Sequence, residues 1–86
     1  MKRSIQILGK RYKIAHLPKM EGLLGQVYVD RQLIEIAADS GPDTQRESLL
    51  HEVVHVIAEQ QMLKLNERQV SLLSVGLYSA GIRVPE

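Results

Sequence analysis

The sequence predicts an α+β fold in which a small antiparallel sheet of three to four strands is followed by two helices. Three observations support this. Apolar and polar residues alternate through much of residues 4–37, as they do on strands with one buried face. From residue 45 onward, apolar residues recur every three or four positions, as on amphipathic helices. Residues 39–44 separate the two regions with a run of turn formers, and this order of elements is typical of α+β domains.

The strand region divides into short runs separated by turn signals. Residues 4–8 and 12–17 alternate on either side of Gly9-Lys10, which fits a two-residue hairpin turn. A second pair of runs ends in residues 33–37, after a predicted turn at Asp30-Arg31. These runs predict two short hairpins, or one meander, in an antiparallel sheet.

The first helix is predicted to begin at Thr44. Thr44 followed by Glu47 has the spacing of a capping box, and no Gly or Pro interrupts the chain from Gln45 to about Met62. One face of this segment is apolar and is expected to face the core. It comprises Leu49, Leu50, Val53, Val56 and Ile57.

The second helix is predicted to begin after Asn66, a residue type that caps helix N-termini. Gly81 suits the position just beyond its end, and Pro85 excludes continuation. Four residues mark the expected buried face: Val70, Leu73, Leu77 and Ala80.

Length and composition limit the classes of protein to consider. A chain of 86 residues forms one domain, here residues 1–86, with a modest core. The absence of Cys excludes disulfides and Cys-ligated zinc, and a net charge of +1 argues against a nucleic-acid partner. Neither a membrane span nor a secretory signal is predicted, which favours a cytoplasmic location. The sequence predicts no particular oligomeric state.

The residues that indicate chemistry are His51-Glu52-Val53-Val54-His55, an H-E-x-x-H motif. Residues four apart on a helix lie roughly 6 Å from each other on one side, so two imidazoles can bind one Zn²⁺. The helix phase places His51 and His55 opposite the apolar face. Glu52 would lie close enough to take a proton from a metal-polarised water.

A catalytic zinc site requires a third protein ligand, and Glu67 is the preferred candidate. It opens the second helix, which can pack beside the first and direct Glu67 toward the histidines. Glu59 continues the histidine stripe, but it lies about 6 Å beyond His55 along the helix axis. His16, the only other His, belongs to a predicted strand. It is expected to be a half-buried structural residue, and a role as the third ligand is the alternative.

The motif also permits less specific interpretations. The two histidines can be surface residues of an amphipathic helix, or the zinc can be purely structural. A non-catalytic, zinc-stabilised regulatory or protein-interaction module is the main alternative to an enzyme. A further alternative is an interaction protein that uses the basic strands around Lys10, Arg11 and Lys13.

The segment from residue 47 to residue 81 resembles the small phage and mobile-element zinc metallopeptidases of the ImmA/IrrE type. It reads ESLLHEVVHVIAEQQMLKLNERQVSLLSVGLYSAG, and the similarity covers most of the chain. The resemblance implies a minimal zincin with His51, His55 and Glu67 as zinc ligands and Glu52 as catalytic acid and base. Val54 stands where the family often has Gly, and Val70-Ser71 replaces an Ala-Asn pair.

The expected function is therefore metal-dependent hydrolysis of peptide bonds in a protein or peptide substrate, by a phage or bacterial enzyme. In zincins generally, an edge strand aligns the substrate above the active-site helix. The predicted strand Leu33–Ala37 directly precedes that helix and is the candidate for this role.

Overall fold

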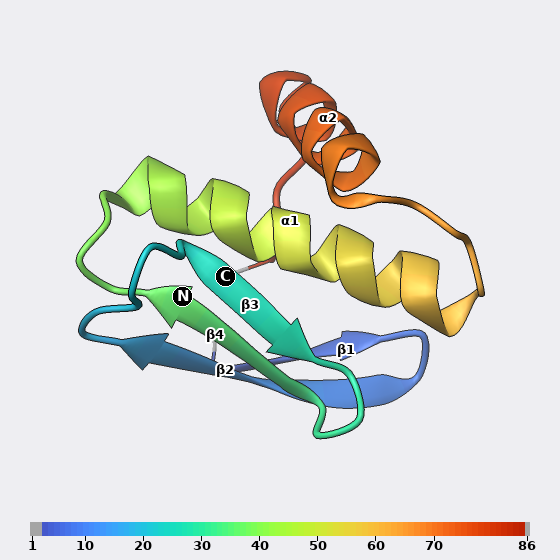
Figure 1. The fold of residues 1–86 in the computed structure, drawn as a ribbon, viewed down its shortest axis with the longest axis horizontal. Helices are drawn as coiled ribbons and strands as arrows, with labels where there is room; N and C mark the ends of the chain where they lie inside the picture. Colours follow the sequence, from blue (N-terminus) through green and yellow to red (C-terminus); the bar gives the residue numbers. More distant parts are fainter. Residues whose placement is uncertain (1–2, 86) are drawn as a thin grey trace.

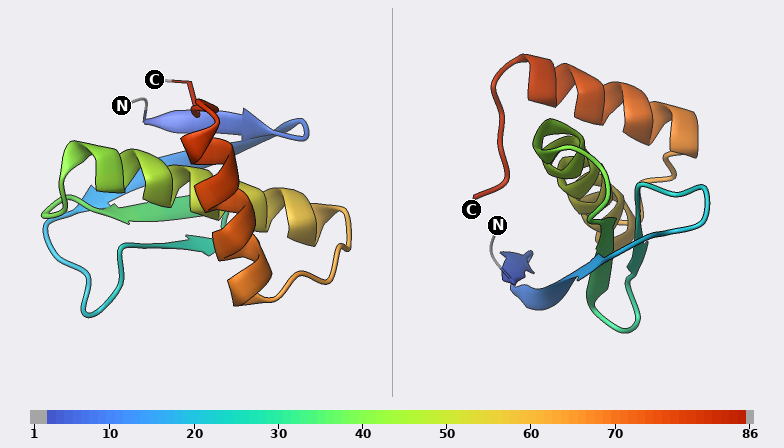
Figure 2. Two further views of the ribbon diagram at one scale, coloured as in Figure 1. Left: turned by 90° about the horizontal axis from the view of Figure 1, so that it is seen from above. Right: turned by 90° about the vertical axis from the view of Figure 1, so that its left-hand side faces the viewer.

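The structure is a computed structural model that describes residues 3–85, and it has the predicted α+β class. A four-stranded sheet packs on one side of a long helix, and the second helix lies on the other side of that helix (Figures 1 and 2). The strands and helices in chain order are β1 (Ser4–Ile7), β2 (Lys10–Leu17), β3 (Gly25–Tyr28), β4 (Leu33–Ala37), α1 (Pro42–Gln60) and α2 (Glu67–Ser79). Neither helix is long and apolar enough to cross a membrane within these residues.

The sheet contains the two predicted hairpins, but it is mixed rather than antiparallel throughout. The order is β1-β2-β4-β3, and β4 pairs with β2 in parallel. After β2, the chain forms β3 at the sheet edge and then returns as β4 between β3 and β2. The central position suits β4 because Ile34, Ile36 and Ala37 are all buried, and parallel pairs are usually buried on both sides.

The first hairpin turn lies one residue earlier than predicted. Its central residues are Leu8 and Gly9, with φ angles of 49° and 81°, and Ile7 pairs with Lys10. Two positive φ angles are typical of a type I′ turn, whose twist matches that of the flanking strands. The predicted turn at Gly9-Lys10 is therefore wrong by one position. The second turn does include Asp30-Arg31, with the Arg31 amide bonded to the Tyr28 carbonyl.

Helix α1 begins at Pro42, not at Thr44, and the predicted capping box is absent. Gly41 occupies the N-cap without a side-chain hydrogen bond, and Pro42 occupies the first turn. Proline suits this place because its ring fixes a helical φ and it has no amide proton to satisfy. Gln45 Nε2 donates to the Ser40 carbonyl at 2.7 Å, which ties the preceding turn to the helix.

The core lies between α1 and the sheet. Its buried residues are Ile7, Tyr12, Ile14, Ile34, Ile36, Leu49, Val53 and Val56. The predicted inner face of α1 is correct except for Ile57, which is exposed. The side of α1 that carries His51 and His55 is turned away from this cluster and is only half-buried.

Helix α2 has the predicted ends but a narrower buried face than expected. Asn66 Oδ1 accepts from the Gln69 amide, and the Gln69 side chain accepts from the Asn66 amide. Gly81, with a φ of 91°, follows the last turn. Within residues 3–85, α2 packs against α1 and against no strand. A single contact between two helices buries only a narrow stripe.

Four residues were predicted to form the buried face of α2, and only Val70 is buried. Leu73 and Leu77 are 47% and 37% exposed, and Ala80 is exposed as well. The other buried residue of the helix is Ser74, one turn after Val70. Apolar periodicity therefore overestimated the area that α2 buries.

Candidate metal centre

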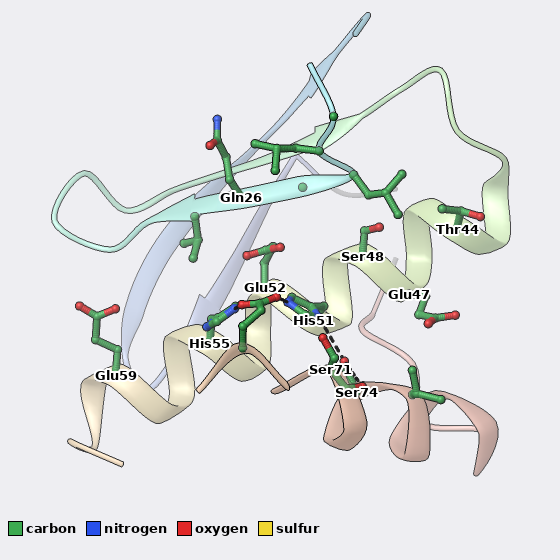
Figure 3. A pocket seen from close by; sticks show the side chains of 17 residues that line it. Gln26, Thr44, Glu47, Ser48, His51, Glu52, His55, Glu59, Ser71 and Ser74 are labelled. Atoms are coloured by element: carbon green, nitrogen blue, oxygen red, sulfur yellow. Dashed lines mark hydrogen bonds and ion pairs between the residues drawn. The ribbon is translucent and has the colours of Figure 1, made fainter. Parts of the chain in front are cut away.

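Helix α1 places His51 and His55 one turn apart on the side that faces α2. Figure 3 shows the two rings side by side on α1. Their ring centroids are 4.9 Å apart, and both side chains are half-buried. Their partner is Glu67, the first residue of α2. Glu67 Oε1 lies 2.7 Å from His51 Nε2, and Glu67 Oε2 lies 2.7 Å from His55 Nε2. The structure thus brings together the three residues predicted as metal ligands.

These three residues form a group that could hold a metal ion. One ligand atom from each lies within 4.8 Å of the others. Two imidazoles and one carboxylate are a usual protein ligand set for catalytic zinc, which keeps its fourth position for water or substrate. The capping box at Asn66 fixes the first turn of α2 and therefore the position of Glu67.

The two alternative third ligands lie outside this group. Glu59 is exposed on α1, one turn beyond His55. His16 lies on β2 with its side chain exposed, rather than half-buried as a structural residue would be. Neither belongs to the group around His51 and His55, in agreement with the preference for Glu67 over both.

Glu52 is the one buried acid on α1, with 6% of its surface exposed. It points toward β3, where a Cβ added to Gly25 would come within 3.3 Å of Glu52 Oε2 (Figure 3). Burial raises the pKa of Glu52 to about 7, since desolvation outweighs the opposing charge of His55, and Glu67 raises it further. A carboxyl with this pKa can exchange protons at neutral pH.

The pKa of Glu67 shifts in the opposite direction. Its desolvation would raise the pKa, but hydrogen bonds and charges from His55 and His51 together outweigh that effect and lower it. Glu67 is therefore ionised at neutral pH, as a metal ligand must be. The two carboxyl groups lie in different environments. This difference suits Glu52 to carry protons and Glu67 to act as a metal ligand.

The group opens onto a cleft of about 960 Å³ between β3, α1 and α2. Its wall on the sheet side is formed by residues 22–27, the loop before β3 and the first part of β3. Among the described residues, no Lys or Arg lines the cleft. Four glutamates line it: Glu47, Glu52, Glu59 and Glu67.

The strand beside this cleft is β3, which corrects the prediction for Leu33–Ala37. That segment, β4, pairs on both sides and has no free edge. In contrast, β3 is an edge strand. The Ala37 amide donates to the Leu24 carbonyl, so alternation along the antiparallel pair leaves the backbone groups of Gly25 and Val27 facing the open edge.

Two residues at the site were not predicted. Gly25 allows β3 to approach Glu52 closely, and Ser74 places its hydroxyl 3.3 Å from His51 Nδ1. A serine within the apolar face of the second helix, four residues after Val70, was the available signal for Ser74. The contact with Gly25 joins segments far apart in sequence and left no local signal.

Comparison with known proteins adds no further identification. No protein-family model, no curated protein sequence and no solved structure matches the chain.

Proposed function

We propose that this chain is a zinc-dependent peptidase of the ImmA/IrrE type that acts on a protein or peptide in the bacterial cytoplasm. The observation that carries the proposal is the position of Glu67, whose two carboxylate oxygens meet the Nε2 atoms of His51 and His55. This ligand set lies beside a buried acid and opens onto a cleft. A purely structural zinc site would have no use for Glu52 or for the cleft.

Each residue of the site has a distinct role in the proposed reaction. His51, His55 and Glu67 would hold Zn²⁺, which when bound polarises a water molecule and the peptide carbonyl. Glu52 accepts a proton from the attacking water and later gives it to the leaving amine. Its pKa of about 7 supports both transfers, because the group can gain or lose a proton at neutral pH.

The substrate is expected to lie along β3. The outward backbone groups of Gly25 and Val27 can pair with an extended peptide, which would add a strand to the sheet. In this arrangement the peptide would lie in the cleft between β3 and α1, on the side where Glu52 is found (Figure 3).

Metal content and peptide cleavage test the proposal together. The purified protein, reloaded with zinc, should bind one equivalent and cleave members of a mixed peptide library detected by mass spectrometry. Glu52→Gln should keep the zinc and lose at least roughly 100-fold in rate, as expected for loss of a general base. Glu59→Gln, an exposed glutamate of the same helix and cleft, is the matched control and should retain activity.

The same experiment separates the enzyme from the alternative of a zinc-stabilised binding module. No zinc in the reloaded wild type would reject both. Bound zinc that raises the melting temperature, with no cleavage of any peptide, would favour the module. Full activity in Glu52→Gln would reject the assigned mechanism.

A further inference from the structure

Ser74 lies at the back of the metal centre, on the buried stripe of α2. It is 1% exposed, and its Oγ lies 3.3 Å from His51 Nδ1 (Figure 3). The same oxygen is 2.9 Å from the Val70 carbonyl and 3.1 Å from the Ser71 carbonyl. The hydroxyl therefore bridges the backbone of α2 and the side of the His51 ring that faces away from Glu67.

The hydrogen-bonding capacity of a hydroxyl decides the direction of these contacts. Ser74 has one proton, and the shorter distances to the two carbonyls indicate that it donates there. Its lone pairs then face His51 Nδ1, which must supply the N–H for a hydrogen bond. An imidazole that carries its proton on Nδ1 presents a free lone pair at Nε2, the atom beside Glu67.

We propose that Ser74 is a positioning residue that holds His51 in the tautomer and orientation needed to bind a metal through Nε2. This role deepens the proposed function and rests on it. The two histidines differ in this respect: among the described residues, the structure shows no comparable partner for His55 Nδ1. Helix α2 thus contributes to the centre twice, through Glu67 and through the hydroxyl behind His51.

Zinc affinity provides the first test. Partners that orient a metal-bound histidine contribute roughly 10–100-fold to metal affinity, and we expect a loss of that size in Ser74→Ala, measured by competition with a chromogenic chelator. The matched control is Ser79→Ala. Ser79 also donates its hydroxyl to a carbonyl of α2, that of Gly76 at 2.8 Å, but it lies at the opposite end of the helix from Glu67.

A second measurement begins with the wild type, where it needs no variant. In zinc-loaded wild type labelled with ¹⁵N, the Nδ1 proton of His51 should exchange with water more slowly than that of His55. Ser74→Ala, checked for folding by circular dichroism, should abolish the difference.

The outcomes distinguish this role from the function on which it rests. Wild type that fails to bind zinc would overturn both. Wild type that binds zinc, with an affinity unchanged within twofold in folded Ser74→Ala, would overturn the role of Ser74 alone. Equal exchange of the two Nδ1 protons in wild type would overturn it as well, and an equal loss of affinity in Ser79→Ala would assign the effect to the helix backbone instead.

Discussion

Four carboxylates line the cleft, and Glu52 differs from the other three because its side chain is buried. The backbone of Gly25 lies directly over it, so removal of its charge from water is the main cause of the raised pKa. A buried acid of this kind lowers the stability of the folded chain whenever it is ionised. In the proposed enzyme, this destabilisation would have a functional reason, because Glu52 would be the proton carrier beside the metal ligands.

This cost predicts a pH effect in the metal-free protein. Between pH 4.5 and about 7, the folded state holds a proton on Glu52 that the unfolded state has lost, so the free energy of unfolding falls as the pH rises. The Glu52→Gln variant cannot show this fall. At pH 8, we expect it to be more stable than wild type by about 3 kcal/mol, with little difference at pH 4.

Urea unfolding in the presence of a chelator, from pH 4 to pH 8, measures this difference. Glu59→Gln should follow the wild-type profile, because Glu59 is exposed. Parallel profiles for wild type and Glu52→Gln would contradict the assigned burial effect.

The site residues that sequence reasoning found are those fixed by helix geometry. His51, Glu52 and His55 belong to one helical segment, and Glu67 follows after a short loop, so local periodicity was sufficient. Gly25 and Ser74 were missed because their roles depend on which segments pack against α1. The segment around Gly25 has no pattern that contains this information, and at Ser74 the signal was only a serine within the apolar face of the second helix.

The two helices begin in different ways, and this difference can be tested with a pair of variants. Asn66→Ala removes a side-chain cap and should lower the free energy of unfolding by about 1 kcal/mol. Thr44→Ala should change it by less than about 0.5 kcal/mol, because Thr44 lies inside α1 and makes no cap. Denaturant melts of both variants provide the comparison. A larger loss for Thr44→Ala would restore the predicted start of α1.

Gly76 lies within α2, where no atom would come within 4 Å of an added Cβ apart from the helix's own backbone. Gly76→Ala therefore meets no steric obstacle and reduces the backbone entropy of the unfolded chain. We expect it to stabilise the protein by up to about 1 kcal/mol. A decrease in melting temperature would show that this face of α2 packs more tightly than the structure indicates.

The identity of each helix and strand could be predicted, but not all of their neighbours. Alternation and helical periodicity located six elements, with small errors at the first turn and at the start of α1. The parallel pairing of β4 with β2 and the exposure of Leu73 depend on which surfaces meet in the folded chain. The edge position of β3 has the same origin, which is why Leu33–Ala37 was wrongly predicted to be an edge strand.

The molecule has three layers, and the candidate metal centre joins the middle layer, α1, to one outer layer, α2. Helix α2 packs against α1 alone among the described elements, and this interface includes the bonds of Glu67 to His51 and His55 as well as the buried Val70 and Ser74. Bound metal would strengthen this connection. Zinc at about a thousand times its Kd should add about 4 kcal/mol to the free energy of unfolding.

Hydrogen exchange locates that stabilisation. With zinc, the amides of residues 67–79 should gain more protection than those of β2 and β4, because release of α2 alone requires loss of the Glu67 ligand. His55→Ala should abolish the gain. Equal added protection in the sheet and in α2 would indicate that α2 detaches only when the whole molecule unfolds.

The parallel pair at the centre of the sheet also has a consequence for how the chain folds. Each hairpin closes over a short turn, and hairpins of this kind form within roughly 1–10 microseconds. The β2–β4 pair joins residues about twenty positions apart, such as Lys13 and Leu33, and the intervening loop must first place β3 on the outside. We therefore expect docking of the second hairpin onto the first to limit the folding rate. The time that the chain needs to reach the folded state would then depend on formation of the β2–β4 pair rather than on either helix.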